Sequence, residues 1–452
     1  MESYDVAVIG MGPGGEQVAG TLAERGLRVL GIESNLLGGE CPYWGCIPSK
    51  MMIRAADALA EARRVPQLAG SVEGIRPDWD LVARRIRDEA TDNWDDRAAV
   101  ERFTGKGGTF VRGKGKVAGT GRVEVDGVSY AIAKGIVVAT GTRPSIPPID
   151  GLAQVPFWTN HEAIEARKLP ASLIVLGGGA IGCELAQVFA RFGVRVSVVE
   201  SADHLLPPEE PEAGQLLRSV LEAEGVQVHV GVSARRVDRD GGGIAVTVGT
   251  GPVLRAERLL VATGRQADPV AAGLDTVGVD PSARTAPVDE RCRVADGVWA
   301  VGDLTGQGAF THVAMYQADI VIRDILGEDG PAADYRALPR VTFTDPEVGS
   351  VGLSEQRARE RFASVAVGSA TVPSTARGWI HKVGNEGLVK LVADADRGVL
   401  VGATSMGPAG GEVLGALTLA VHAQVPLDTL RSMIYAYPTF HRGIEDALRD
   451  LS

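Results

Sequence analysis

Cysteine is scarce in this sequence, which contains four cysteines among 452 residues. That is far below what the disulfide scaffold of a small secreted domain needs. Only Cys41 and Cys46 lie close together along the chain, whereas Cys183 and Cys292 stand apart. In a reducing compartment, a close cysteine pair indicates redox or metal chemistry rather than structural cross-linking.

Long apolar runs and long basic runs are also missing. No run of about 18 apolar residues occurs, and no basic segment followed by an apolar one opens the chain. The net charge is −11, which argues against nucleic acid as a partner. We therefore expect a cytoplasmic protein that binds neither nucleic acid nor a membrane.

Glycine, in contrast, is abundant, with 58 residues, while the hydrophobic and charged fractions of 45% and 23% are ordinary for a globular protein. Many glycines indicate tight turns or backbone that packs closely against ligands. A chain of this length is too long for a single core, so we expect about two to four domains.

An internal repeat is the strongest organisational signal. Residues 6–34 read VAVIGMGPGGEQVAGTLAERGLRVLGIES, residues 173–201 read LIVLGGGAIGCELAQVFARFGVRVSVVES, and the two segments align without a gap. Each copy predicts an apolar strand, a glycine turn, an amphipathic helix and a second strand that ends in Glu.

The glycines of each turn suit a dinucleotide. The first makes the turn from strand to helix, the second lets the backbone approach a pyrophosphate, and the third lets the helix pack tightly on the sheet. The pyrophosphate then accepts hydrogen bonds from the N–H groups at the positive end of the helix. The turn residues assigned to the two sites are Gly10, Gly12, Pro13, Gly14, Gly15, Gly177, Gly179, Ile181 and Gly182.

An acid closes each copy of the repeat. Glu33 and Glu200 each lie 23 residues after the first glycine, where a carboxylate can hold a ribose 2′-hydroxyl. Glu200 favours NADH, because a carboxylate repels the 2′-phosphate of NADPH. Residues 198–203 contain no Arg or Lys, although Arg195 or a loop residue leaves NADPH open. The sequence therefore predicts two dinucleotide sites, with NAD(H) favoured over NADP(H) in the second.

The cysteine pair lies in residues 38–50, which read GGECPYWGCIPSK. The spacing of Cys41 and Cys46 is longer than in a zinc knuckle, and no second Cys or His pair follows at ligand spacing, so we expect no metal. The intervening residues fit about one helical turn, which brings two sulfurs together and places one near a helix N-terminus, where a thiolate is favoured.

This loop resembles the redox-disulfide motif of the flavoprotein disulfide reductases, a family that includes lipoamide dehydrogenase and mercuric reductase. The resemblance covers essentially the whole chain. It implies that the first repeat binds FAD and the second binds NADH. It also implies that Cys46 is the charge-transfer thiol against the flavin and that Cys41 is the interchange thiol facing the substrate.

Further segments match this family in order. Val301–Asp303 is similar to the second FAD motif, whose Asp303 is implied to bind the ribityl chain. Lys50 and Glu184 match an ion pair that the family places near the flavin N5. Thr344–Val348 opens a segment similar to the interface domain. The other implied cofactor-binding residues are Gly39, Thr140, Gly141, Gly302 and Gly264.

These landmarks imply an α/β fold with two Rossmann-like dinucleotide-binding domains and a C-terminal α+β dimerisation domain. The FAD-binding domain is expected over 1–149 and 265–335, the NAD(H)-binding domain over 150–264, and the interface domain over 336–452. The resemblance also implies a homodimer whose active sites are shared between subunits.

The sequence departs from the family near its C-terminus. Where lipoamide dehydrogenase has a His-Pro followed by a Glu, aligning the prolines places Tyr437 and Arg442 at the positions of the His and the Glu. A positioned acid or base is worth about 10²–10⁴ in rate, and a tyrosine is a poor base. His441 and Glu445, on a helix expected from Pro438, remain an alternative dyad.

Three functions are compatible with these features. The favoured one is an NADH-dependent disulfide oxidoreductase whose substrate is not lipoamide, with Tyr43, Trp44 and Tyr437 expected to shape the substrate mouth. The second is an NADH-dependent reductase of a quinone or a metal ion, or a transhydrogenase, that uses the flavin. The third is a non-catalytic flavin-binding subunit.

Overall fold

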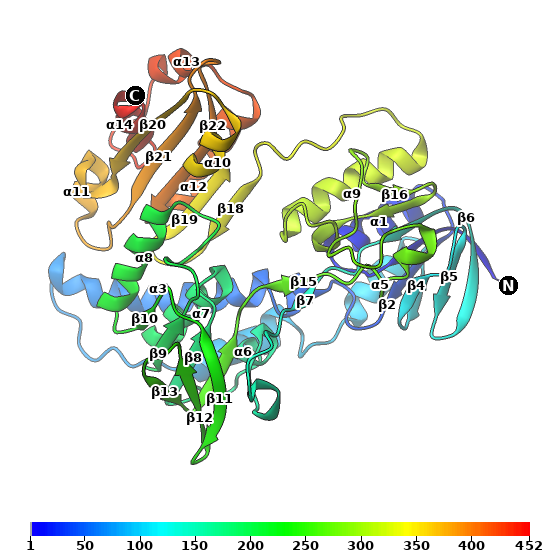
Figure 1. Ribbon diagram of the computed structural model, residues 1–452, viewed down its shortest axis with the longest axis horizontal. Coiled ribbons are helices and arrows are strands. Elements are labelled where there is room, and N and C mark those ends of the chain that lie inside the picture. The colour runs from blue at the N-terminus through cyan, green and yellow to red at the C-terminus, as the bar shows by residue number, and fades with distance from the viewer. Residues whose placement is uncertain (1) are drawn as a thin grey trace. The chain divides into compact units, whose positions relative to one another are not determined.

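The computed structural model describes residues 2–452, which divide into two compact units (Figure 1). The first unit comprises the residues up to 49 together with 84–145 and 265–334. The second comprises 50–83, 146–264 and 335–452. This division reflects packing and assigns no cofactor. Among the described residues, no helix is both long and apolar enough to cross a membrane.

An eight-stranded sheet forms the centre of the first unit, and its core strands β17, β6, β1, β2 and β3 run parallel. Strands β4 and β5 extend it in antiparallel fashion from β6, and β16 pairs with β17. The strands are β1 (Ser3–Ile9), β2 (Val29–Glu33), β3 (Thr109–Arg112), β4 (Gly115–Val117), β5 (Arg122–Val125), β6 (Val128–Val138), β16 (Arg293–Ala295) and β17 (Val298–Ala300).

Both faces of this sheet are buried, which explains the continuous apolar run of β1. Val6 and Val8 pack on one side with the helices, whereas Ala7 and Ile9 pack on the other side. Parallel strands covered on both faces are apolar throughout. The helices are α1 (Pro13–Glu24), α2 (Glu40–Tyr43), α5 (Arg97–Gly105) and α9 (Thr311–Leu326), and α1 lies beside α9 in Figure 1.

A short antiparallel ribbon marks where the chain leaves the first unit and returns to it. Its strands are β7 (Arg143–Pro144) and β15 (Arg265–Gln266). Two helices continue from one unit into the other, α3 (Cys46–Arg64) and α4 (Trp79–Arg85).

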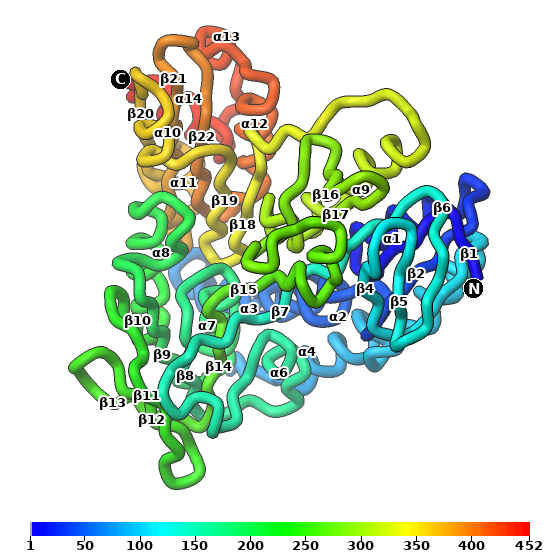
Figure 2. Tube along the Cα trace, turned by 45° about the vertical axis from the view of Figure 1, so that its right-hand side comes forward, coloured from blue at the N-terminus to red at the C-terminus, as the bar shows by residue number. Residues whose placement is uncertain are grey.

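The second unit contains a four-stranded parallel sheet of order β10-β9-β8-β14 and a three-stranded antiparallel sheet of order β11-β12-β13, both visible in Figure 2. The strands are β8 (Ser172–Leu176), β9 (Arg195–Val199), β10 (Gln227–His229), β11 (Ala234–Asp240), β12 (Gly243–Val248), β13 (Val253–Ala256) and β14 (Arg258–Val261). The helices are α6 (Asn160–Ile164), α7 (Ala180–Arg191) and α8 (Pro211–Ala223).

A five-stranded antiparallel sheet of order β18-β19-β22-β21-β20 completes the second unit. Helices α12 and α14 pack against it through a shared apolar cluster. Its strands are β18 (Pro339–Thr342), β19 (Glu347–Gly352), β20 (Val365–Thr371), β21 (Leu388–Asp394) and β22 (Val399–Gly407). Its helices are α10 (Glu355–Arg361), α11 (Ala376–His381), α12 (Gly410–His422), α13 (Leu427–Ser432) and α14 (Arg442–Asp450).

The helix expected from Pro438 begins later, at Arg442, so that expectation is wrong by one turn. The N–H of Arg442 donates to the carbonyl of Thr439, and the N–H of Gly443 donates to that of Phe440. These three-residue turns precede the helical ladder. His441 is consequently the N-cap residue of α14 rather than a residue on its face.

A buried arginine joins α3 to α7 inside the second unit. Arg191 on α7 pairs with Asp57 of α3 at 2.7 Å, Glu224 at 2.6 Å and Asp345 at 2.7 Å, and its side chain is 2% exposed. Removing the last partner of a buried ion costs about 3–5 kcal/mol, but Arg191 keeps Glu224 and Asp345 when Asp57 is neutral. Burial raises the pKa of Asp57 to about 6, against the opposing effect of Arg191.

We predict that Asp57→Asn stabilises the protein at pH 7.5 by about 1 kcal/mol, allowing for the partly exposed side chain. The ordinary pKa of 3.8 rises on folding, so ionised Asp57 opposes folding above pH 6, and this cost disappears as the pH falls to about 4. The gain should therefore grow between pH 4 and 6 in denaturant titrations. Glu61→Gln, an exposed change on the same helix, is the control. A variant less stable than the parent at pH 7.5 would contradict the prediction.

Candidate active site

The first glycines of the two turns lie in the same strained backbone. Gly10 has a φ of +91° and Gly177 a φ of +106°. A Cβ at Gly10 would overlap the carbonyl of Ala139, and one at Gly177 would overlap that of Ala262. Each turn therefore touches the end of the neighbouring strand in its sheet, β6 in the first copy and β14 in the second. Only glycine permits that contact.

The second and third glycines of the two turns also have the same surroundings. A Cβ at Gly15 would overlap the carbonyl of Gly10, and one at Gly182 that of Gly177, so both helices start tightly on their turns. Around Gly12 and Gly179 nothing lies within 4 Å of an added Cβ. No described side chain caps α1 or α7. Open space before uncapped N–H groups is what a pyrophosphate requires, so both turns fit a dinucleotide.

The acids at the ends of the repeat are held in place by backbone N–H groups. Glu33 accepts from Met11 at 2.8 Å and from Asn35 at 2.8 Å. Glu200 accepts from Gly178 at 2.6 Å and from Ala202 at 2.7 Å. Every donor in the second copy is the counterpart of a donor in the first. The repeat thus extends from the sequence to individual hydrogen bonds.

A further part of the repeat lies outside the segment aligned by sequence. Ala262-Thr263-Gly264 repeats Ala139-Thr140-Gly141, and each tripeptide supplies the carbonyl that faces the first glycine of its turn. The identical tripeptide is the signal that relates Gly264 to Gly141. Both glycines have a positive φ.

The cysteine loop packs on the first dinucleotide turn. Gly39 has a φ of +68°, and a Cβ there would lie 2.8 Å from the Cα of Gly12. Cys41 lies on α2 and is half-buried, whereas Cys46 is the first residue of α3 and is exposed. Both are present as thiols. The loop therefore brings the sulfurs to the turn that would hold a pyrophosphate.

The two thiols are not equivalent. The Cys46 thiol beside it and its own burial raise the pKa of the Cys41 thiol above its ordinary value. Cys46 lies instead at the positive end of α3, which favours a thiolate. Its Sγ is 3.5 Å from the Oγ1 of Thr311, the first residue of α9. No sequence motif pointed to Thr311, which is distant from Cys46 along the chain.

The sequence predicted that Tyr43 and Trp44 shape a substrate mouth. The structure contradicts this prediction, because the two residues are only 6% and 8% exposed. Their rings pack against each other with centroids 5.8 Å apart. Both side chains are therefore turned away from solvent.

Asp303 belongs to a polar cluster that the sequence did not reveal. It lies in a short 3-10 helix, Gly302–Thr305, and its Oδ2 accepts from the Oγ1 of Thr142 at 2.8 Å. Arg265 donates to the Oγ1 and the carbonyl oxygen of Thr142, both at 2.8 Å, and lies 3.6 Å from Glu40. Burial raises the pKa of Asp303, whereas Thr142 and Arg265 lower it.

The predicted ion pair between Lys50 and Glu184 is formed. The Nζ of Lys50 lies 2.9 Å and 3.2 Å from the carboxylate oxygens of Glu184, whose side chain is 7% exposed. The backbone N–H of Phe343 also donates to Glu184, at 2.8 Å. Lys50 is four residues after Cys46 on α3, one helical turn along. The sequence predicted both charged residues of this pair but not the contact that Phe343 makes with Glu184.

Near the C-terminus, Tyr437 is 69% exposed and the Arg442 guanidinium lies 5.3 Å from the centre of its ring. Arg442 pairs with Glu445 at 3.2 Å, and Arg449 pairs with the same carboxylate. No contact described in residues 2–452 joins His441 to Glu445. The alternative dyad is therefore not assembled within this chain.

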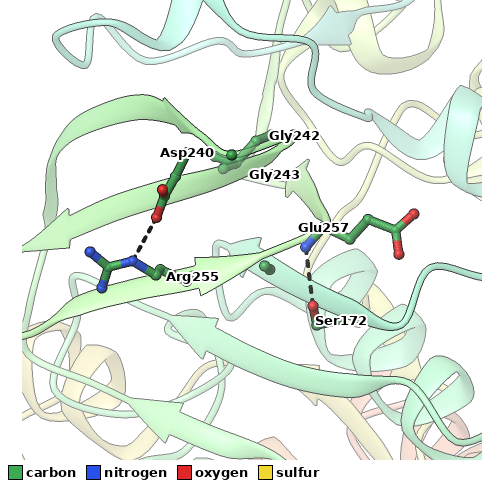
Figure 3. A pocket seen from close by; sticks show the side chains of 9 residues that line it. Ser172, Asp240, Gly242, Gly243, Arg255 and Glu257 are labelled. Atoms are coloured by element: carbon green, nitrogen blue, oxygen red, sulfur yellow. Dashed lines mark hydrogen bonds and ion pairs between the residues drawn. The ribbon is translucent and has the colours of Figure 1, made fainter.

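Two other features of the second unit resemble binding sites. Figure 3 shows an open hollow by β11, β12 and β13, where Arg255 donates to Asp240 at 2.6 Å and the N–H of Glu257 donates to Ser172 at 3.1 Å. Within each of these two exposed pairs, the donor and the acceptor satisfy each other's hydrogen bonding. Three carboxylates also converge at metal-ligand spacing, but the ammonium of Lys390 binds all of them at 2.8–2.9 Å; they are Glu210, Glu212 and Glu355.

Comparison with known proteins accounts for nearly the whole chain. Residues 4–318 match the family model of the pyridine nucleotide-disulphide oxidoreductases, and residues 338–448 match the dimerisation domain of that family. A mercuric reductase of Streptomyces lividans is 34% identical over 456 residues, covering 98% of this chain and 95% of the relative. A dihydrolipoyl dehydrogenase of Chlorobaculum tepidum is 34% identical over 463 residues, covering 99% and 97%.

Among solved structures, the Cu(II) complex of the HOCl-induced flavoprotein disulfide reductase RclA from Escherichia coli is similar, with a TM-score of 0.86 and 25% identity over 99% of both chains. Matched glycine turns, a cysteine pair packed on the first of them and a dimerisation domain thus agree with these relatives. The chain belongs to the pyridine nucleotide-disulphide oxidoreductase family, whose members are FAD-dependent oxidoreductases that use a pyridine nucleotide.

Proposed function

We propose that the chain is an NADH-dependent disulfide oxidoreductase that passes electrons through FAD to Cys41 and Cys46, and from there to a disulfide other than lipoamide. Residues 1–149 and 265–335 bind FAD, 150–264 bind NADH, and 336–452 form the interface of a homodimer. The contact of Gly39 with Gly12 carries the proposal, because it holds the cysteine loop on the FAD turn. Redox-active thiols of this kind suit a reducing cytoplasm.

FAD, when bound, accepts a hydride from the nicotinamide and delivers two electrons. The side chains and helix ends of the protein would position FAD for that transfer. The N-terminus of α1 and Glu33 would hold the FAD dinucleotide, Asp303 would hold its ribityl chain, and Lys50 with Glu184 would supply an ion pair to the flavin. An ammonium there stabilises negative charge that develops on reduction.

The two cysteines have different roles in the transfer of electrons from FAD to the substrate. Cys46 is the thiolate of the reduced pair, because it begins α3, and Cys41 attacks the substrate disulfide. The raised pKa of the Cys41 thiol means that it holds its proton at neutral pH. In lipoamide dehydrogenase a histidine takes that proton, and Tyr437 occupies its position here. With no histidine to carry a proton, the Cys41 proton would pass to water as the thiol attacks, and we therefore assign a substrate whose leaving thiolate is stable without receiving a proton from the protein.

Anaerobic titration with NADH tests the electron path. We predict a long-wavelength absorption band at about two electrons per FAD, from the Cys46 thiolate against the flavin. Cys46→Ser should abolish the band. Cys41→Ser should show it before NADH is added, because Cys46 then has no partner with which to form a disulfide. Cys292→Ala, at a buried cysteine, is the control and should match the parent. Reduction of the parent without the band would refute the path.

Glu200 supports NADH as the electron donor. Its carboxylate is fixed by two backbone N–H groups at the end of β9, where it would accept from a ribose hydroxyl and repel a 2′-phosphate. Arg195, the nearby cation that leaves NADPH open, begins β9 and is thus about 16 Å away along the strand. The carboxylate therefore faces the 2′ position without a compensating positive charge from Arg195.

We predict that Glu200→Gln lowers the preference for NADH over NADPH by about 10- to 100-fold in kcat/KM, the value of one hydrogen bond to a charged group. Glu33→Gln is the matched control from the first copy. It should weaken retention of FAD and leave the ratio of the two nicotinamides unchanged. An unaltered ratio in Glu200→Gln would show that another residue selects the nucleotide.

A second candidate acceptor is a thiophilic metal ion. Two observations favour it, namely the mercuric reductase relative and the Cu(II) complex of the similar RclA. A metal ion drawn to a thiolate also removes the need for the missing base. As in the first proposal, both cysteines would take part, because the reduced pair would present two sulfurs to the ion.

Comparison of acceptors at pH 7 separates these proposals. We predict that an aromatic disulfide is reduced about 10²-fold faster than lipoamide, because its leaving thiolate departs without protonation. Cys41→Ser should lose activity with the aromatic disulfide, Hg²⁺ and Cu²⁺ but keep any transfer from the flavin to a quinone. Faster turnover of Hg²⁺ or Cu²⁺ than of any disulfide would favour the metal reductase, and equal rates with lipoamide would contradict both.

A further inference from the structure

Lys50 lies between a carboxylate and an aromatic ring. Its Nζ is 2.9 Å from Glu184 and 4.6 Å from the centre of the Phe343 ring. The backbone N–H of Phe343 donates to Glu184 at 2.8 Å. One residue therefore contacts both members of the ion pair, the ammonium through its ring and the carboxylate through its backbone.

We propose that Phe343 is a positioning residue that holds the Lys50 ammonium in place through the face of its ring. This inference rests on the proposed function, in which Lys50 lies beside the flavin. An aromatic face attracts a cation, and the attraction strengthens as the cation loses water. Lys50 is 35% exposed, and its long side chain would otherwise sample several rotamers. The ring and the carboxylate together restrict it to one.

Phe343 can act in this way because its own segment is anchored at Asp345. The N–H of Asp345 donates to Gln187 at 2.8 Å, and Gln187 donates back to the Asp345 carbonyl at 2.8 Å. The carboxylate of Asp345 pairs with Arg64 at 2.6 Å and with Arg191 at 2.7 Å. Four interactions thus fix the backbone two residues after the ring.

The polar residues that make these contacts lie in rows along two helices, α7 and α3. Glu184, Gln187 and Arg191 are all buried and follow one another on one face of α7, and each of them contacts Phe343 or Asp345. On α3, Lys50 and Arg64 reach the same short segment. The loop between β18 and β19 is thus clamped to both helices, and it belongs to the segment matched as the dimerisation domain.

The alternative is that Phe343 merely fills space. In that case leucine would replace it without consequence for Lys50, and the electron density of the ring would not matter. Three variants separate the two roles. Phe343→Leu removes the aromatic face, Phe343→Tyr retains it, and 3,4,5-trifluorophenylalanine at position 343 keeps the shape while weakening the negative face. The last variant remains informative if the leucine variant does not fold.

The first measurement is the rate at which an acylating reagent modifies Lys50 in the full-length chain without FAD, followed by mass spectrometry. We expect the leucine and trifluoro variants to react about three- to tenfold faster than the parent, the range for a partly exposed cation–π contact. The tyrosine variant should match the parent. Phe362→Leu, which removes a ring 5.7 Å from Arg361, is the control and should leave Lys50 unchanged.

The second measurement is the midpoint potential of the flavin in the holoenzyme. The same three- to tenfold change in an equilibrium corresponds to a decrease of about 15–30 mV for two electrons. In a Lys50→Met background, Phe343→Leu should cause no further decrease, because the ring acts through Lys50. A parental Lys50 labelling rate in both the leucine and trifluoro variants would overturn the inference. Failure of NADH to reduce the parent protein would instead refute the proposed function and leave the labelling result standing.

Discussion

Backbone lies directly against backbone at the start of each dinucleotide turn, and this contact requires the absence of a side chain. Gly10 faces the carbonyl of Ala139, and Gly177 faces that of Ala262. The contact brings the end of one strand to the beginning of a helix, so that the uncapped N–H groups open toward the edge of the sheet. Gly39 adds a third such contact in the first unit, which places the cysteine loop on the turn itself. The proposed cofactor site and the proposed redox pair therefore share one steric requirement.

The beginnings of helices supply a second common element. Helices α1 and α7 present their N-termini to the expected pyrophosphates, α3 begins at Cys46, and α9 begins at Thr311 beside the Cys46 sulfur. Each group that these ends would meet carries negative charge, as a phosphate or as a thiolate. The two acids that are expected to bind ribose are different, because Glu33 and Glu200 each accept hydrogen bonds from backbone N–H groups of their own turn. Positive helix ends and fixed carboxylates thus define separate parts of each site.

The sequence predicted the turns, the acids, the cysteine loop and the charged pair because each depends on local spacing or on a recognisable motif. It did not predict Phe343 beneath Lys50, because the two residues are far apart along the chain and meet only through tertiary packing. The inward positions of Tyr43 and Trp44 depend likewise on what packs around the loop, which residue type alone does not determine. Aromatic residues suit a substrate mouth and a core equally well, so only the fold decides.

The substitution of Tyr437 and Arg442 for a histidine and a glutamate changes more than one proton transfer. Arg442 stacks on the tyrosine ring and pairs with Glu445, so that a guanidinium, which keeps its proton, occupies the region of the missing acid. The neighbouring Cys46 and burial raise the pKa of the Cys41 thiol, so in the proposed mechanism its proton passes to water and the acceptor must do without a proton from the protein. A disulfide with a stable leaving thiolate does so, and so does a metal ion that binds sulfur strongly. The two proposed acceptors therefore share one chemical property, which is that neither requires a proton from the protein.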